Sequence, residues 1–337
     1  MFDLRETTSL GAGLAARVAR ALGEVYPGVP VGPLVRLPAG QAGETYHVCV
    51  GSMDLIVKAV PAPARPVGRH DMLRQAAMLR ALAGSAVPVP SVVAVDTVPP
   101  AWFAMTWIAG EAVEPVLDDI WIEPVLARQR MLAAARLLGR MHQLAVGALR
   151  IHRPPEEDPA THIRRWSRLV AAVPDELCPG GLRLAERLAW AVPARLPAAL
   201  LHGDFRLGNI LAAQRRICAL IDWETWTVGD PRIDLAWFLI FADHTNFPGL
   251  GRETQGLPNE AELVERYLGE REPLPDLDWF RAVARLKMAA IMAHNLRRHR
   301  AATASGATTG VGERLPATIE RLIQSGSQIA TTLHTGH

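Results

Sequence analysis

Apolar positions recur with a helical period at the start of the chain and with a strand pattern directly after it. Residues 9–23 place Leu14, Val18 and Leu22 at helical spacing, which predicts an amphipathic helix. Three short runs rich in β-branched residues follow, separated by PAGQAG (38–43) and GSMD (51–54), and predict a three-stranded antiparallel meander. A helix over 72–82 and two strands within 88–95 and 101–108 complete a small α+β lobe.

Beyond residue 110 the pattern becomes mostly helical. The longest regular stretch, 123–144, carries Met131, Ala135, Leu138 and His142 on one stripe. Strand-like runs interrupt the helices only within 199–223, and a Gly/Ser/Thr/Ala stretch over 301–312 predicts a linker. We expect a first lobe over 1–108 and a second, mostly helical lobe over 109–337. The other predicted helices are two within 151–198, then 230–242, 260–269, 277–300 and one from Pro316.

Composition narrows the class of protein. Apolar residues make up 49% of the 337 residues, and a formal net charge of +2 gives no field that would favour nucleic acid or a membrane surface. The three cysteines are widely spaced, which argues against a disulfide framework or a zinc site and suits a reducing cytosol. Neither a signal peptide nor a membrane-spanning run is visible, so we expect a cytoplasmic protein of unknown oligomeric state.

The most informative segment is LHGDFRLGNIL, residues 201–211, with polar side chains between two apolar runs. Residues 209–222 predict a hairpin with its turn at 213–216, in which Ala212 pairs with Ile217. Asn209 and Asp222 then meet at the open end, with Cα atoms ~5–8 Å apart. A carboxamide and a carboxylate suit Mg²⁺, which takes few protein ligands and keeps water or phosphate oxygens for the others.

Asp204 precedes Asn209 by five residues and is placed to accept the proton of a substrate hydroxyl. Protein kinases use the same D-x-x-x-x-N spacing, followed by a metal-binding Asp, for phosphoryl transfer. Arg206 falls where a cation neutralises the transferred group. Taken singly, Asp204 and Asn209 would be ordinary loop residues, and Asp222 a cap. A metal-dependent hydrolase using Asp204 and Asp222 is a further alternative, which predicts phosphate release without a nucleotide.

Supporting roles are predicted for residues around this segment. His202 is expected to brace the loop by a hydrogen bond rather than to act in catalysis. In VGDPRIDLAW, Asp230 is the expected N-cap, with Pro231 at the first helical position. Asp234 lies in the first turn, where the helix dipole favours an acid and where it can also brace the catalytic loop. His142 is expected to be a satisfied core histidine.

The first lobe supplies candidates for holding a nucleotide. The loop with Gly40, Gln41 and Gly43 allows backbone N–H groups to approach phosphates, although an ordinary hairpin loop explains it as well. Lys58, a cation in an apolar strand, is placed to reach the α- and β-phosphates, or else protects a strand edge. GAGLAA at 11–16 matches a dinucleotide motif but lacks the preceding strand and the βαβ unit.

These motifs, together with LIVK, LGRMHQL and IDWETWTVGDPRIDLAWFL, resemble the aminoglycoside phosphotransferase superfamily of small-molecule kinases. The branch most similar includes the kinase domain of acyl-CoA dehydrogenase family members 10 and 11. The resemblance implies a bilobal protein-kinase-like fold with a small antiparallel-sheet N-lobe, which binds nucleotide, and a larger helical C-lobe, which binds the acceptor. It implies ATP and Mg²⁺ as cofactors, with the adenine held by backbone groups around Thr106, Trp107 and Ile108.

One position departs from the family pattern. Gln75 stands where a Glu usually pairs with the strand Lys, and a neutral amide can hydrogen-bond Lys58 without supplying charge. Asp71, one turn earlier, is a candidate substitute. A nucleotide-binding protein with weak or no kinase activity is therefore an alternative to the expected ATP-dependent kinase.

The acceptor is expected to be a small hydroxylated molecule. A polycationic antibiotic would require a pocket lined with carboxylates. The candidates for such a lining are Glu111, Glu114, Asp118 and Asp119. A cationic face on the helix over 281–300 would instead favour a neutral or anionic acceptor, unless these are simply solvated helix charges. The resemblance suggests a hydroxyacyl compound, and an aminoglycoside or other antibiotic is the alternative. The cations concerned are Arg285, Lys287, Arg297, Arg298 and Arg300.

Overall fold

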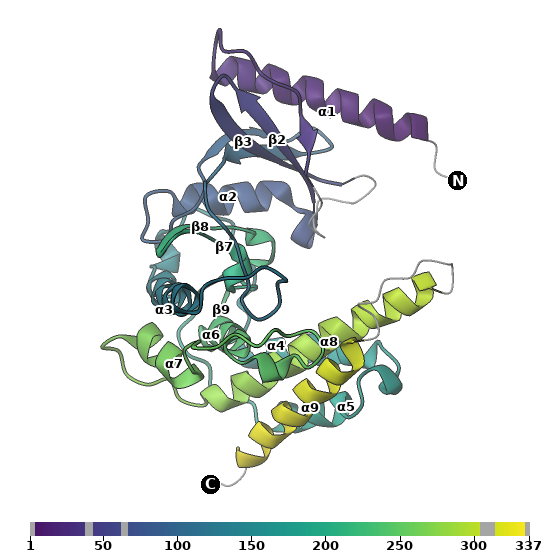
Figure 1. Ribbon diagram of the computed structural model, residues 1–337, viewed down its shortest axis with the longest axis vertical. Coiled ribbons are helices and arrows are strands. Elements are labelled where there is room, and N and C mark those ends of the chain that lie inside the picture. Colours follow the sequence, from purple (N-terminus) through teal and green to yellow (C-terminus); the bar gives the residue numbers. More distant parts are fainter. Residues whose placement is uncertain (1–3, 38–42, 62–66, 304–313, 334–337) are drawn as a thin grey trace. The chain divides into compact units, whose positions relative to one another are not determined.

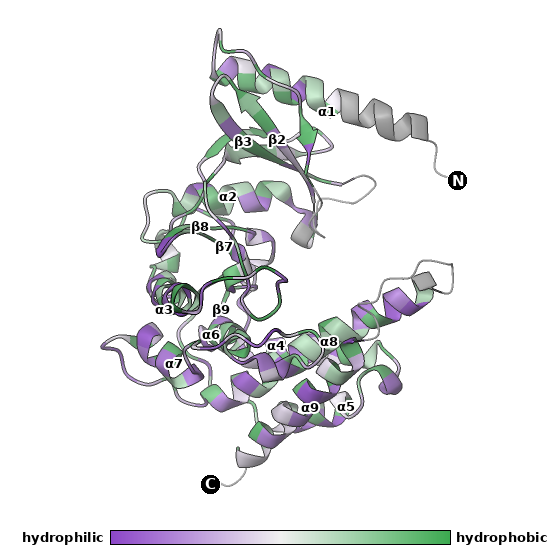
Figure 2. Cartoon of the chain, in the orientation of Figure 1, coloured by the Kyte–Doolittle hydropathy of each residue, from purple (hydrophilic) through white to green (hydrophobic). Residues whose placement is uncertain are grey.

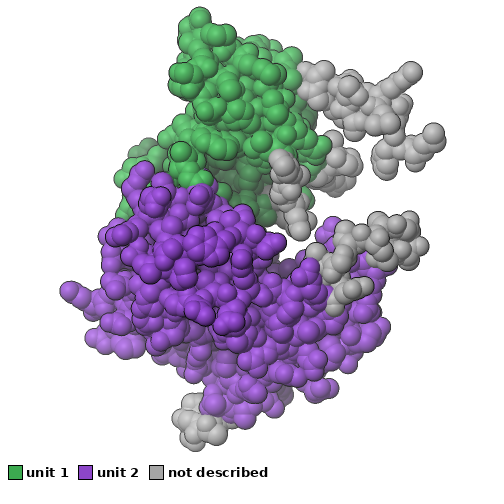
Figure 3. All heavy atoms as spheres, in the orientation of Figure 1, with its two compact units in different colours: residues 1–110, 149–151, 218–225 green, residues 111–148, 152–217, 226–337 purple. Residues whose placement is uncertain are grey.

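The computed structural model describes residues 4–37, 43–61, 67–303 and 314–333. The chain divides into two compact units, coloured separately in Figure 3. Unit 1 contains residues 1–110, 149–151 and 218–225, and unit 2 contains 111–148, 152–217 and 226–337. The segment 218–225 thus belongs to unit 1, although it follows the motif of residues 201–211 in the sequence.

Unit 1 is built on a five-stranded antiparallel sheet with the order β1-β2-β3-β5-β4. The predicted meander is confirmed, and its central hairpin closes tightly at Gly51, whose φ of 59° is a left-handed conformation that glycine adopts without strain. The strands are β1 (Val35–Arg36), β2 (Glu44–Val50), β3 (Met53–Ala59), β4 (Val92–Asp96) and β5 (Trp102–Thr106).

Two helices belong to this sheet. α1 (Leu4–Val25) is longer than predicted and packs its apolar stripe, Leu14, Val18 and Leu22, in one core cluster with Val48 and Val50 of β2. Figure 1 shows α1 alongside β2 and β3, and Figure 2 shows polar and apolar residues along the C-terminal, coloured part of this helix. α2 (Met72–Leu82) has the predicted bounds, and it begins after Asp71, whose Oδ1 accepts a hydrogen bond from the Arg74 backbone N–H.

Unit 2 is mostly helical, as the pattern predicts. Its core surrounds α8, whose buried residues include Trp279, Phe280 and Leu286, and α9 lies beside α8 (Figure 1). α3 ends three residues earlier than predicted and begins after Glu123, which caps it. The helices are α3 (Pro124–Met141), α4 (Pro159–Ala171), α5 (Gly181–Trp190), α6 (Arg232–Leu239), α7 (Glu260–Leu268), α8 (Leu277–Thr303) and α9 (Leu315–Thr332).

Short strands carry the motif segment. β6 (Ala199–Leu201) pairs antiparallel with β9 (Thr227–Gly229), and β7 (Ile210–Ala213) and β8 (Arg216–Leu220) form a two-stranded sheet. The predicted hairpin is therefore present, and Gln214 in its turn has a φ of 51°. These elements confirm an α+β fold with an antiparallel sheet in the N-terminal part and helices in the C-terminal part. No helix among the described residues has the length and apolarity needed to cross a membrane.

Candidate active site

The loop between β6 and β7 holds Asp204 in unit 2. Gly203 has a φ of 85°, a left-handed conformation that allows the chain to turn directly after the strand. Leu207–Asn209 then form one turn of 3-10 helix that leads into β7. The polar residues of the motif are therefore displayed on a short, tightly turned loop that has strands at both ends.

The carboxylate of Asp204 is held by two hydrogen-bond donors, one on each oxygen. Its Oδ1 accepts from the indole Nε1–H of Trp237 at 2.8 Å, and its Oδ2 accepts from the Asn209 amide at 2.9 Å. The same Asn209 amide also donates to the Asp204 backbone carbonyl at 2.8 Å. Each oxygen keeps lone pairs for a further donor, so the carboxylate is oriented and able to accept a hydroxyl proton. Unit 2 thus brings together two of the predicted site residues.

Asp234 anchors the same loop from α6. It is fully buried, and its two oxygens accept the backbone N–H groups of His202 (2.6 Å) and Gly203 (2.9 Å). Burial by itself would raise the pKa of this carboxyl, but the neighbouring His142 and His202 outweigh it and hold the pKa below its ordinary value. A charged carboxylate inside the protein therefore fixes the backbone that precedes Asp204.

The two histidines near Asp234 have identifiable partners. His202 is buried, and its Nδ1 lies 3.3 Å from the Asp204 backbone N–H, consistent with the bracing role expected for it. His142 Nδ1 lies 2.8 Å from the Tyr267 hydroxyl. The other ring nitrogen of His142 is 3.8 Å from Asp234 Oδ2, too long for a hydrogen bond but close enough for a charge interaction.

Asp230 braces the start of α6. Its Oδ1 accepts from the Arg232 backbone N–H, as an N-cap would, although the helix itself begins one residue later than predicted, with Pro231 in the cap position. Its carboxylate also forms a fully buried ion pair with the Arg232 guanidinium at 2.7 Å and accepts from the Leu196 backbone N–H. Its contacts are therefore structural.

Arg206 lies between two acids. Its Nε is 3.5 Å from Asp204 Oδ2, and its Nη1 is 3.9 Å from Glu114 Oε2. A Cβ at position 208 would collide with the guanidinium, so the glycine there leaves room for Arg206. Burial raises the pKa of Glu114 to about 8, although the attraction of Arg206 works in the opposite direction. Glu114 Oε2 accepts the Gly208 backbone N–H at 3.2 Å, so it also supports the loop.

The raised pKa of Glu114 makes stability depend on pH. A group whose pKa is higher in the folded state gives its full stabilisation below its unfolded pKa, and this is lost as pH rises through the folded value. We expect Glu114→Gln, which cannot titrate, to remove this loss. The difference between wild type and variant in the free energy of unfolding should change by up to about 1.4 kcal/mol per pH unit between about pH 4.5 and 8. Urea unfolding of both proteins across this pH range measures the difference. If the free energies of unfolding of wild type and variant changed in parallel with pH, the prediction would be contradicted.

Lys287 contacts the loop that carries Asp204, a role that the sequence did not predict; it was expected only as one of the cations on the helix over 281–300. It is 6% exposed, its Nζ donates to the Gly203 carbonyl at 2.9 Å, and it lies 3.6 Å from the centre of the Trp237 ring. Burial lowers the pKa of Lys287 to about 8, opposed by the carboxylates of Asp204 and Asp234. A single Lys in the apolar run VARLKMAAIMA was the available signal. Together with Trp237 it forms the support of Asp204.

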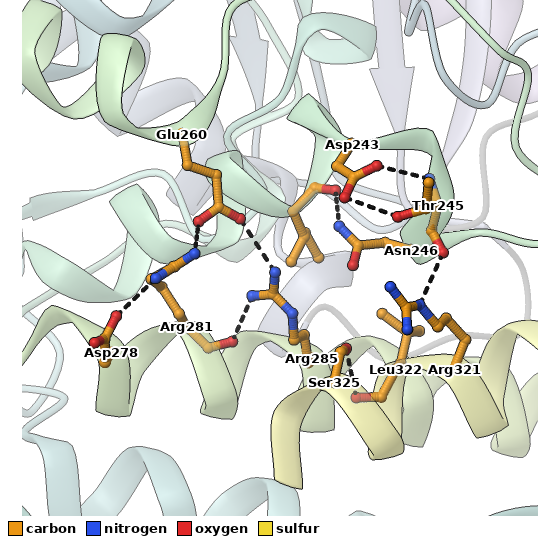
Figure 4. A network of polar contacts seen from close by, with 11 residues as sticks. Asp243, Thr245, Asn246, Glu260, Asp278, Arg281, Arg285, Arg321, Leu322 and Ser325 are labelled. Atoms are coloured by element: carbon orange, nitrogen blue, oxygen red, sulfur yellow. Dashed lines mark hydrogen bonds and ion pairs between the residues drawn. The ribbon is translucent and has the colours of Figure 1, made fainter. Parts of the chain in front are cut away.

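The other cations of α8 differ in their surroundings. Arg285 is buried and pairs with Glu260, toward which Arg281 also points (Figure 4). Arg285 is thus part of an internal network between α7 and α8, and the interpretation as a solvated helix charge is wrong for Arg285 and Lys287. Arg297, Arg298 and Arg300 are exposed, as that interpretation expects.

Unit 1 brings together Lys58 and Asp222. The Lys58 ammonium lies 2.8 Å from Asp222 Oδ1, with the lysine side chain largely buried. Asp222 has a φ of 64°, which is uncommon for a residue with a Cβ and stores strain that is typical of functional positions. The predicted phosphate-binding cation is therefore paired with the predicted metal-binding carboxylate.

The position that departs from the family pattern lies close to this pair. Gln75 is buried, and together with Lys58 and Asp222 it lines a pocket whose walls are otherwise apolar. Asp71 caps α2, so it has a structural contact of its own. The other lining residues are Leu79, Pro90, Phe103, Met105, Ile221 and Trp223.

The structure describes only some of the remaining candidates for nucleotide binding. Gly40 and Gln41 lie outside the described residues, whereas Gly43 is described, and a Cβ there would press against Met72. Thr106 ends β5, and its backbone N–H donates to the Ser91 carbonyl. The Trp107 N–H donates to the Asp54 carbonyl, and Ile108 follows outside the strand.

Comparison with known proteins identifies the family. The model of the phosphotransferase enzyme family matches residues 33–283. Acyl-CoA dehydrogenase family member 10 of Mus musculus is 24% identical over 307 residues, covering 86% of this chain and 28% of that protein. Viomycin phosphotransferase of Streptomyces vinaceus is 29% identical, covering 64% of this chain and 75% of that protein. The chain thus spans less than a third of the length of the first of these relatives.

Solved structures show the same fold. A putative aminoglycoside phosphotransferase from Ralstonia eutropha superposes with a TM-score of 0.74 at 20% identity, covering 94% of this chain and 98% of that one. A thermostable mutant of aminoglycoside phosphotransferase APH(4)-Ia, solved as a ternary complex with ADP and hygromycin B, gives a TM-score of 0.58 at 17% identity, covering 90% and 98%. These structures show the fold, and the family match over residues 33–283 shows that the chain belongs to the phosphotransferase enzyme family.

Proposed function

We propose that this protein is a small-molecule kinase that transfers the γ-phosphate of ATP to a hydroxyl group of its acceptor. Asp204 accepts the hydroxyl proton, Arg206 offsets charge on the transferred group, and Lys58 binds the nucleotide phosphates. The observation that carries the proposal is the orientation of Asp204 by Trp237 and Asn209 on a loop anchored by Asp234. A related enzyme solved with ADP supports a nucleotide as the donor.

We also propose Mg²⁺ as the metal, with Asn209 and Asp222 supplying its protein ligands. Both offer hard oxygen atoms, and the Asn209 amide already turns its nitrogen toward Asp204, which leaves its oxygen for another partner. Bound Mg²⁺ would neutralise charge on the β- and γ-phosphates during transfer. We place the reaction in a reducing cytosol, in keeping with the three free cysteines.

For the acceptor we propose a neutral or anionic hydroxy compound, with hydroxyacyl compounds as the first class to test. Three of the acids that would attract a polycation are paired or uncharged. Glu111 lies 3.3 Å from the Arg130 guanidinium, and Asp118 accepts a hydrogen bond from the Glu114 backbone N–H. Glu114 has a pKa near 8, which favours its uncharged form at neutral pH. Regions of acyl-CoA dehydrogenase family proteins are among the relatives, which supports this choice. The relationship to viomycin phosphotransferase makes antibiotics the second class.

The test is a screen for transfer. The full chain is incubated with Mg²⁺·ATP and three sets of compounds: hydroxyacyl thioesters and hydroxy acids, viomycin-type and aminoglycoside antibiotics, and a metabolite extract. Mass spectrometry then detects a gain of one phosphate, and Asp204→Ala is the control for background transfer. Calorimetry with Mg²⁺·ATP runs in parallel. Nucleotide binding without phosphate gain in any hydroxylated compound would overturn the proposal in favour of a nucleotide-binding protein.

A further inference from the structure

A second group of ligand-forming side chains lies in unit 1 on the β2–β3 hairpin. It consists of His47, Cys49 and Asp54, whose potential ligand atoms all lie within 4.8 Å of one another. His47 Nε2 is 2.7 Å from Asp54 Oδ1, and the Cys49 thiol donates to the same oxygen at 3.5 Å. None of the three belongs to the proposed phosphotransfer machinery.

The strand register explains why the three side chains converge. His47 and Cys49 are two residues apart on β2, so they project from the same face of the sheet. Asp54 on β3 is the direct cross-strand partner of Cys49, and such neighbours have Cβ atoms about 4.5–5.5 Å apart. Two alternate residues on one strand and one on its neighbour give three ligands on one side, which leaves a fourth position open to solvent.

The backbone holds this arrangement firmly. The hairpin is paired along its whole length, from Glu44↔Ala59 to Val50↔Met53, and β3 pairs with β5 on its other side. The Asp54 carbonyl accepts the Trp107 backbone N–H at 3.1 Å, and the Trp107 ring packs edge-on against the imidazole of His47 at 5.9 Å between centres. Ordering the ligands therefore requires little further loss of backbone freedom, which favours binding.

The donor set selects a class of metal. One imidazole nitrogen, one thiolate sulfur and one carboxylate oxygen suit a borderline or soft ion such as Zn²⁺, whereas Mg²⁺ prefers oxygen ligands alone. The hydrogen bond to Asp54 raises the pKa of the Cys49 thiol, so a metal ion would have to displace the thiol proton. Asp54 Oδ1 already lies within hydrogen-bonding distance of both His47 Nε2 and the Cys49 thiol.

We propose that His47, Cys49 and Asp54 form a site for a divalent transition-metal ion, Zn²⁺ foremost, with water in the fourth position. This proposal does not rest on phosphotransfer. All three side chains are accessible, with 26% of the His47 and 52% of the Asp54 side chain exposed, so the ion has a direct entry path. The site differs in chemistry from the Mg²⁺ site proposed at Asn209 and Asp222.

The test uses Co²⁺ and Zn²⁺ as probes with the full, tag-free chain. We expect Co²⁺ to give a thiolate charge-transfer absorption that saturates at one ion per chain, and Zn²⁺, but not excess Mg²⁺, to abolish it. Zn²⁺ should also slow alkylation of Cys49, identified by mass spectrometry. Both measurements are independent of kinase activity, so they remain informative if no acceptor is ever found.

Variants assign the ligands. Losing even an outer-shell partner weakens metal binding about 10- to 100-fold, so we expect at least this from His47→Ala and Asp54→Asn, and loss of the charge-transfer band from Cys49→Ser. Cys218→Ser is the matched control and should keep both band and affinity. Circular dichroism confirms that each variant folds. Absence of a saturable band in wild type, or its survival in Cys49→Ser, would overturn the proposal.

Discussion

Turnover should fall about 10²- to 10⁴-fold when Asp204 is replaced by alanine, while Mg²⁺·ATP still binds. General-base catalysis by a positioned side chain contributes a factor of this size. The Trp237 indole loses its acceptor, and the Asn209 amide keeps only the Asp204 backbone carbonyl. Steady-state kinetics on an acceptor found by the transfer screen measures the fall, and calorimetry measures nucleotide binding.

Two further variants make this result specific. Asp204→Asn keeps an oxygen for the Trp237 indole but cannot accept a proton, so its turnover should fall nearly as far. Asp175, which is exposed in the short helical turn Asp175–Leu177, provides the matched control, and Asp175→Ala should leave turnover unchanged. If Asp204→Asn kept wild-type turnover, Asp204 would not be the base.

The second large effect is expected from Asp234→Ala, which should lower the free energy of unfolding by about 3–5 kcal/mol. The substitution leaves the buried N–H group of His202 and the partly buried N–H group of Gly203 without their acceptor, and it removes the charge beside His142. Turnover should fall as well, because the backbone that precedes Asp204 is no longer anchored. Urea unfolding measures the first effect, and kinetics below the transition measures the second.

Asp243 offers a comparison for this variant. It too accepts a backbone N–H, from Thr245, but at a partly exposed turn (Figure 4). Asp243→Ala should therefore lose only about 1 kcal/mol, the usual value for an N-cap. Equal losses in the two variants would mean that Asp234 is not the anchor that its buried contacts indicate.

The sequence predicted the elements of this fold best where a helix-capping residue and the spacing of the apolar residues indicate the same boundary. α2 has its predicted bounds because Asp71 caps a regular apolar stripe, and the meander follows from turn residues such as Gly51. The ends of α1 and α3 were less accurate, because helix ends depend on tertiary packing as well as on propensity. The sequence therefore predicted the type of each element better than it predicted where the element begins and ends.

The site residues divide in a similar way. Asp204 and Asn209 were predictable because their spacing lies within one short segment. The supports Trp237, Lys287 and Glu114 come from distant parts of the chain, and nothing in their local sequence connects them with residue 204. A buried lysine and a buried carboxyl look like surface charges in a sequence, because their partners are brought together only by folding.

The left-handed backbone of Asp222 has an evolutionary consequence. Glycine would adopt this conformation with less strain, by roughly 1 kcal/mol or more, but it would bring no carboxylate to Lys58 or to a metal ion. Among residues without a carboxylate, laboratory selection for heat resistance alone should therefore favour glycine at position 222, whereas selection for phosphate transfer should keep aspartate. Sequencing the survivors of both selections would show whether durability and activity compete at this residue.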